Sequence, residues 1–278
     1  MPCPGASGDG SDQAGRPHHA QPRLVGLGKR EAAEPAPCLS HQPGVPRCGI
    51  NHLALPVQWP RTRDELIDEQ RRLAALDPPL WRFDPGARIG GCFVCFARGC
   101  TGPGHAGDAA WAAATVGREA AFVQGRAGAP YEPGLLALRE GALLEAAVRA
   151  LPAPPDVLLV DSTGRDHPRQ AGLALHLGAI ADLPTVGVTH RALVAEGEWP
   201  PDERGARSPL LLDGELVSYW LRTREGTRPL AVHAAWRTDA DTAVEVVLSV
   251  CRARTPEPLR RARRRAREAR AGVNQLSR

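Results

Sequence analysis

The residues with the clearest chemical potential lie where an apolar strand ends. Residues 156–161 (DVLLVD) end in Asp161, and a polar loop with Asp166, His167 and Arg169 follows directly. A short run of Val and Leu is typical of a buried strand in an α/β sheet. Open sheets of this kind place their chemistry at the carboxyl ends of their strands. An aspartate is also common at the start of a turn, so a purely structural role for Asp161 stays open at this point.

A second acid lies on the apolar side of a predicted helix. The spacing i, i+4, i+7, i+11 puts Glu140 on one face with Leu136, Leu143 and Ala147. A carboxylate in that place is costly unless a cation meets it. If Glu140 and Asp161 converge, their oxygens suit a hard cation, Mg²⁺ or Mn²⁺. Such a site serves phosphodiester hydrolysis by activating water and neutralising charge on the phosphate.

The cysteines offer a different chemistry. Cys92 and Cys95 form a CxxC pair, with Cys100 nearby, and the chain has seven cysteines in all. A zinc site needs further ligands at matching spacing, and none is evident. We therefore expect free thiols that pack as small apolar residues in a strand. A redox or zinc protein remains as a third class of function.

The elements that position these residues predict an α/β fold with one mixed sheet. Three strands in succession indicate an antiparallel meander, and the strand before Asp161 then begins a parallel βαβ unit. We expect antiparallel strands first, then parallel ones, flanked by helices. The expected strands are 88–96, 109–116, 119–123, 156–161, 185–188, 210–212, 216–217 and 230–235, and the expected helices are 61–76, 135–150, 170–181 and 241–251, with an arginine-dense helix or tail at 258–271.

Composition sets the domain organisation and the broad class. The chain has 278 residues, 42% of them hydrophobic and 24% charged, as in an ordinary soluble globular protein. Residues 1–54 are rich in Pro and Gly without periodicity, which predicts a disordered extension. We expect a folded domain over residues 55–271 and a C-terminal tail over residues 272–278. Without a signal segment or an apolar stretch of about 20 residues, we expect a cytoplasmic monomer with no membrane contact.

Several ordered blocks resemble the endonuclease V family. Residues 131–140 (YEPGLLALRE) resemble its PYxPGxLxxRE block, and residues 161–178 resemble its VDGxGxxHPRxxGLAxHLG block. Residues 183–188 are similar to its LPTIGVAK segment, and residues 256–258 match its late PEP. The likeness covers about residues 58–270. Several blocks in the right order are far more specific than any one of them.

This resemblance implies a ribonuclease-H-like fold and a function. The function is Mg²⁺-dependent hydrolysis of a phosphodiester bond near deaminated adenine (inosine) in DNA or RNA, as part of repair. The resemblance implies metal binding by Glu140 and Asp161 and a place beside the scissile phosphate for His167. It implies a wedge at the lesion for Tyr131, which is physically reasonable because aromatic rings stack into disrupted base steps.

The same resemblance names further nucleic-acid contacts: Pro133, Gly134, Arg169 and His190. Structural alternatives stay open for several of these residues. Tyr131 could be an aromatic that packs the loop, and His167 a loop histidine bonded to backbone. Arg169 could contact a phosphate or pair with a nearby acid.

The sequence departs from the family pattern at positions that carry chemistry. The first family strand reads GGVDV, whereas residues 90–94 read GGCFV, so Phe93 stands in place of a metal-binding aspartate. His190 replaces the lysine of GVAK, and Trp236 replaces the histidine of a late GHR motif. Two hypotheses follow. Either Asp241 or Asp166 completes a cage with Glu140 and Asp161, or the chain binds the lesion without cleaving the strand.

Overall fold

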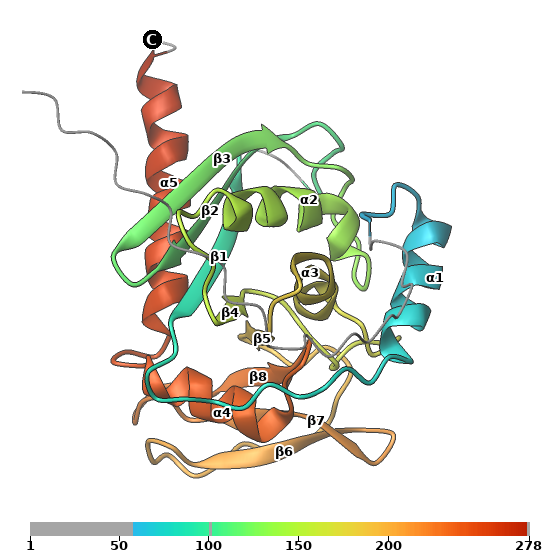
Figure 1. Ribbon diagram of the computed structural model, residues 1–278, viewed down its shortest axis with the longest axis vertical. Helices are drawn as coiled ribbons and strands as arrows, with labels where there is room; N and C mark the ends of the chain where they lie inside the picture. Colours follow the sequence, from blue (N-terminus) through green and yellow to red (C-terminus); the bar gives the residue numbers. More distant parts are fainter. Residues whose placement is uncertain (1–57, 100–101, 277–278) are drawn as a thin grey trace, which may run out of the picture. The chain divides into compact units, whose positions relative to one another are not determined.

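The computed structural model describes residues 58–99 and 102–276, with side chains up to residue 272. The predicted disordered extension, Cys100 and the last residues of the predicted tail lie outside these ranges. The described part contains one eight-stranded mixed sheet in the order β3-β2-β1-β4-β5-β8-β7-β6 (Figure 1). The strands are β1 (Ile89–Phe96), β2 (Ala109–Val116), β3 (Glu119–Arg126), β4 (Val157–Val160), β5 (Thr185–Thr189), β6 (Arg207–Leu212), β7 (Glu215–Leu221) and β8 (Leu230–Ala234).

The pairing confirms the predicted mixed sheet and extends it. β1, β2 and β3 form the antiparallel meander, and β1–β4 and β4–β5 are the parallel pairs. Beyond β5 the sheet turns antiparallel again through β8, β7 and β6. Asp213 and Gly214 connect β6 and β7 with positive φ angles of 52° and 83°, as the Asp-Gly signal predicts for a two-residue hairpin.

Helices cover both faces of the sheet (Figure 1). The helices are α1 (Arg63–Ala74), α2 (Leu136–Arg149), α3 (Leu173–Ala181), α4 (Ala240–Ser249) and α5 (Glu257–Leu276). α1, α2 and α3 share one hydrophobic core with the sheet face that carries Cys92 and Leu158. α4 and the start of α5 pack against the opposite face, around Leu159 and Val186. None of the described helices is both long and apolar enough to cross a membrane.

α5 lies against β1, and this contact decides what surrounds the strand end. A Cβ on Gly91 would come within 2.6 Å of the backbone of Pro258, so only glycine allows so close an approach. Leu259, Ala262 and Ala266 bury the inner face of the helix. The arginine-dense segment is therefore a packed helix, and it continues to Leu276 rather than ending near residue 271.

Candidate nucleic-acid site at the ends of β1 and β4

The sheet brings Phe93 and Asp161 to neighbouring positions. β1 and β4 are parallel, and their last paired residues are Cys92 and Val160. Phe93 and Asp161 are the next residues on the two strands. The side chain at position 93 thus lies beside Asp161, where the resemblance implies a carboxylate ligand and the sequence supplies a phenyl ring.

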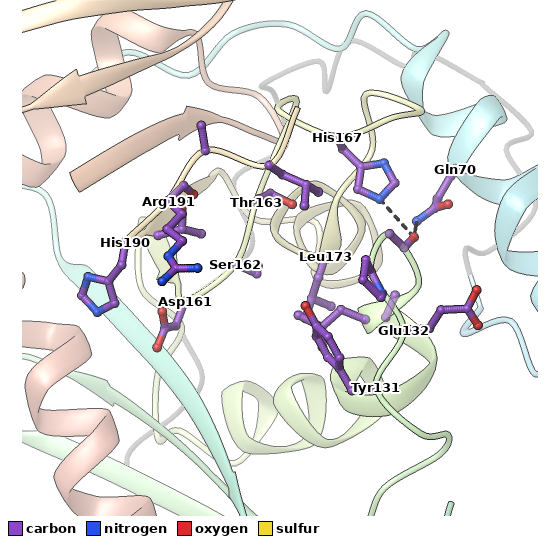
Figure 2. A pocket seen from close by; sticks show the side chains of 17 residues that line it. Gln70, Tyr131, Glu132, Asp161, Ser162, Thr163, His167, Leu173, His190 and Arg191 are labelled. Carbon is purple, nitrogen blue, oxygen red and sulfur yellow. Dashed lines mark hydrogen bonds between the residues drawn. The ribbon is translucent and has the colours of Figure 1, made fainter. Parts of the chain in front are cut away.

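A cavity of about 370 Å³ opens at this end of the sheet (Figure 2). Its walls come from the segment before α2 (131–134), the loop after β4 (161–163) and the residues after β5 (189–193). Leu173, at the start of α3, lies among them. The volume falls within the range of small-molecule sites, and the mixture of apolar walls and a few polar groups is typical of such sites.

Asp161 forms an ion pair inside the protein. Nη2 of Arg263, on α5, donates a hydrogen bond to Oδ2 of Asp161 at 2.7 Å. The same guanidinium lies over the ring of Phe93, 5.0 Å from its centroid, a cation–π arrangement. Nε of Arg263 is buried and has no hydrogen-bond partner among the described residues. The positive charge next to Asp161 is therefore supplied by the chain itself.

The charge of Asp161 acts on Glu140. Burial, followed by repulsion from Asp161, raises the pKa of Glu140 to about 8, and Arg139 acts in the opposite direction. The carboxyl group is therefore mainly protonated near neutral pH. The buried stripe of α2 runs through Ala137, Leu144 and Val148, so Glu140 lies at the margin of the apolar face rather than at its centre.

Asp241 and Asp166, the other acids proposed for a metal cage, make hydrogen bonds and an ion pair elsewhere in the structure. The carboxylate of Asp241 pairs with Arg207 and accepts a hydrogen bond from Tyr219, on the β6–β7 hairpin. Asp166 is fully buried and accepts backbone hydrogen bonds from residues 193–195 at 2.7–2.8 Å. No group of three or more His, Cys, Asp or Glu side chains able to hold a metal occurs in the described ranges. The predicted three-acid cage is not formed.

These contacts allow a test of whether the site fits a divalent cation. Of the acids that the sequence singles out, only Glu140 and Asp161 remain for a metal, and the carboxylate of Asp161 already has a cationic partner. Phe93 offers no oxygen where a third ligand is expected. A hard cation such as Mg²⁺ needs several oxygen ligands in near-octahedral geometry. The residues present do not fit a resident Mg²⁺ or Mn²⁺ ion.

The loop that carries Tyr131 is held by one backbone carbonyl. The oxygen of Gly134 accepts hydrogen bonds from Gln70 Nε2 at 3.0 Å, His167 Nε2 at 3.0 Å and Arg169 Nη2 at 2.9 Å. Gly134 has φ of 77°, the left-handed conformation that favours glycine. The turn before α2 is therefore fixed from α1 and from the loop after β4 at once.

His167 and Arg169 both hydrogen-bond to the turn at Gly134. His167 is buried, donates through Nε2 to Gly134 and accepts through Nδ1 from the Arg169 amide at 3.2 Å. Burial lowers the pKa of His167 to about 4, so the ring is neutral. Arg169 Nε donates to Gln70 at 2.6 Å. Among the described residues His167 bonds to backbone and Arg169 to neutral acceptors, and His167 also lines the cavity.

Tyr131 and Pro133 are exposed residues that line the cavity. The side chain of Tyr131 lies at the cavity with half its surface exposed, and Figure 2 shows it opposite Leu173. Its backbone amide donates to the carbonyl of Pro103 at 2.7 Å. Pro133 lines the cavity from the same segment. Half of the Tyr131 side chain is thus packed against described residues, and the other half is open to a ligand.

The wall formed by residues 189–193 contains His190 and also Arg191, which the sequence analysis did not predict as a site residue. His190 and Arg191 are exposed at the cavity, which Asp161 also lines (Figure 2). Ser162 lines the cavity too, is buried, and its Oγ has no hydrogen-bond partner in the described ranges. The sequence does mark Ser162, because this residue is a serine where the family pattern has glycine.

The CxxC pair has the structure expected of packing residues. Cys92 and Cys95 are buried free thiols. They belong to different hydrophobic cores: Cys92 lies with α2 and α3, and Cys95 with Trp111 and α5. Burial is the first cause that raises the pKa of both thiols. The two sulfurs do not share a site, which removes the argument for a zinc or redox centre at this pair.

Comparison with known proteins gives a consistent result. The sequence model described as "Endonuclease V" matches residues 89–264. The Streptomyces avermitilis endonuclease V is 37% identical over 220 residues, which are 75% of this chain and 92% of the relative. The Thermus thermophilus endonuclease V is 40% identical over 197 residues, 70% of this chain and 80% of the relative.

Solved structures show the same likeness. The crystal structure of the Streptomyces avermitilis endonuclease V superposes with a TM-score of 0.69 at 35% identity, covering 79% of this chain and 97% of the other. The Ciona intestinalis endonuclease V superposes with a TM-score of 0.62 at 20% identity, over 76% and 98% of the chains. That second protein is in complex with a DNA that contains an inosine followed by a ribo-adenosine.

Proposed function

The chain belongs to the endonuclease V family, and on that premise we propose that it binds nucleic acid containing deaminated adenine, with the inosine base in the Tyr131 cavity. Its family relatives are nucleases that act on phosphodiester bonds. The observation that supports binding is the cavity itself: a half-exposed Tyr131 stands at its edge, on a turn fixed by three hydrogen bonds to one carbonyl.

The cavity has the features that recognition of a displaced base requires. A base taken out of the stack is read by packing between apolar or aromatic side chains and by hydrogen bonds to its edge. Leu173 and Tyr131 supply the apolar surfaces, and the exposed side chains of His190 and Arg191 supply hydrogen-bonding groups at the cavity. Since the Tyr131 turn is already fixed in the free protein, little conformational entropy is lost on binding.

Cleavage has weaker support. Hydrolysis of a phosphodiester bond near inosine is the second candidate function, favoured by the coupling between Glu140 and Asp161. The phenyl ring at position 93, in place of a third ligand, and the ion pair between Asp161 and Arg263 count against it. We therefore favour recognition without cleavage as the function of the present sequence.

A binding measurement tests the proposal. Fluorescence anisotropy would compare labelled oligonucleotides, DNA and RNA, that differ only in one inosine or adenine. We expect wild-type protein to prefer inosine, and Tyr131→Ala to lose about 1–3 kcal/mol of binding free energy, the usual contribution of base–aromatic stacking. Tyr131→Phe is the matched control and should retain the preference. Equal affinity of the wild-type protein for both oligonucleotides would overturn the proposal.

A further inference from the structure

The edge of the cavity beside Asp161 carries more positive than negative charge. Arg191 lines the cavity together with Asp161 and Ser162 (Figure 2). Asp161 is paired with Arg263, and Arg191 forms no ion pair within the described part of the chain. The charge of Arg191 is therefore available to a ligand, and its side chain is exposed.

His190 adds an oriented donor to this edge. Nη1 of Arg254 donates to Nδ1 of His190 at 3.0 Å, so the ring proton lies on Nε2, which faces away from that contact. The Arg254 side chain is anchored by the carbonyls of Arg228 and Pro229. Like Arg191, Arg254 has no carboxylate partner among the described residues. The cavity edge therefore carries one arginine without an ion-pair partner among the described residues and one imidazole N–H, with Arg254 behind the imidazole.

Arg263 explains why this edge is available to an anion. Its hydrogen bond to Asp161 neutralises the carboxylate, and the ring of Phe93 packs against the guanidinium. An aspartate at position 93 would place a second negative charge beside Asp161 and would call for a cation. With Phe93 and Arg263 in place, Asp161 repels an incoming phosphate much less than a free carboxylate would.

We propose that Arg191 and His190 form a phosphate subsite that acts without a metal ion, with Arg263 in the place of a divalent cation as the partner of Asp161. The inference rests on the proposed function, because the ligand is the phosphodiester that flanks the base in the cavity. Arginine is well suited to this role, since its planar guanidinium binds phosphate oxygens through charge-assisted hydrogen bonds.

The test compares two arginine variants, each in a buffer with EDTA and in a buffer with Mg²⁺. Anisotropy titrations with an inosine-containing oligonucleotide would be run in EDTA and in Mg²⁺, for wild type, Arg191→Gln and Arg118→Gln. Arg118 is exposed in the β2–β3 turn, away from the cavity lining, and its substitution makes the same change in net charge. Neither side chain is buried, so both variants should fold.

We expect equal affinity in EDTA and in Mg²⁺ for the wild-type protein. Arg191→Gln should weaken binding about tenfold, the loss of one charge-assisted hydrogen bond. It should also lower the dependence of log Kd on log salt by about 0.7–0.9. Arg118→Gln should change neither. Binding that is lost in EDTA, or Arg191→Gln and Arg118→Gln with the same affinity, would overturn the subsite.

The two proposals fail in different ways. A wild-type protein that does not distinguish inosine from adenine contradicts the proposed function, whatever the metal dependence. A protein that prefers inosine but requires Mg²⁺ for binding keeps the proposed function and contradicts the subsite.

Discussion

The guanidinium of Arg263 and the carboxylate of Asp161 are 2.7 Å apart, although 102 positions separate them in the chain. This ion pair occupies the end of β4, where convergent carboxylates would otherwise require a bound cation. Phe93 packs against the guanidinium of Arg263. The residue that replaces the family's aspartate therefore contacts the same arginine that pairs with Asp161.

Reversing this arrangement should create a metal site. Phe93→Asp combined with Arg263→Gln adds a third carboxyl group and frees Asp161, so we expect the double variant to bind one Mn²⁺ per chain. Electron paramagnetic resonance of free Mn²⁺ measures the binding directly. Phe93→Asn with Arg263→Gln is the matched control without the added charge. One Mn²⁺ bound by the wild-type protein and lost in Asp161→Asn would contradict the account.

The fixed turn at Gly134 should matter for ligand binding as well as for stability. Gly134→Ala forces a side chain into φ of 77° and brings Cβ to 3.2 Å from Arg169 Nη2, so we expect a loss of about 1 kcal/mol or more in unfolding free energy. Gly117→Ala, at φ of 52° in open space, is the control for backbone strain. Thermal unfolding should detect both variants, but only Gly134→Ala should weaken binding of the inosine-containing strand.

Asp166 should hold the third wall of the cavity. Asp166→Ala leaves three backbone N–H groups without their acceptor, and an unsatisfied buried donor costs about 1–3 kcal/mol. We expect a large loss of stability in urea unfolding and faster proteolysis of residues 190–195. Asp166→Asn keeps one carbonyl acceptor and should fall between the alanine variant and wild type. An alanine variant as stable as wild type would show that these bonds contribute little.

Buried histidines should make the protein sensitive to acid. His176 is fully buried, stacks on Trp59 with ring centroids 4.7 Å apart, and burial lowers its pKa to about 4. The unfolded chain takes up a proton near pH 6.5 while the folded ring stays neutral. Stability is therefore full above that pH and falls as pH decreases toward 4. His167 adds a shift of the same sign.

The variant His176→Phe keeps an aromatic ring against Trp59 and removes the titration. Between pH 6.5 and 4 its unfolding free energy should fall by on the order of 3 kcal/mol less than that of wild type. Urea unfolding at a series of pH values measures the difference. Parallel curves for the two proteins would show that His176 does not contribute.

Local patterns predicted the sheet well, and they failed where side chains meet over long distances. Val and Leu runs marked β4 and β5, and the Asp-Gly pair marked the β6–β7 hairpin, because these signals are confined to a few residues. The spacing of α2 placed Glu140 on the apolar face, although the buried stripe is displaced by one position toward Ala137 and Leu144. The rotation of α2 about its axis depends on the side-chain volumes in the core. The spacing of apolar residues along the sequence carries no information about those volumes.

The site shows the same limit. Asp161 and Tyr131, which the strand end and the family blocks single out, both line the cavity. Arg263 could not be selected, because it is one of many arginines in a segment that reads as a solvated helix. Its role depends on the packing of α5 against Gly91, which only the folded chain reveals.

The most direct test is a strand-nicking assay on inosine-containing DNA and RNA, with Mg²⁺ or Mn²⁺, at protein concentrations that saturate binding. We predict that the wild-type protein leaves the bound strand intact, whereas Phe93→Asp with Arg263→Gln produces a nick near the inosine. Nicking by the wild-type protein that disappears in Asp161→Ala would contradict the account.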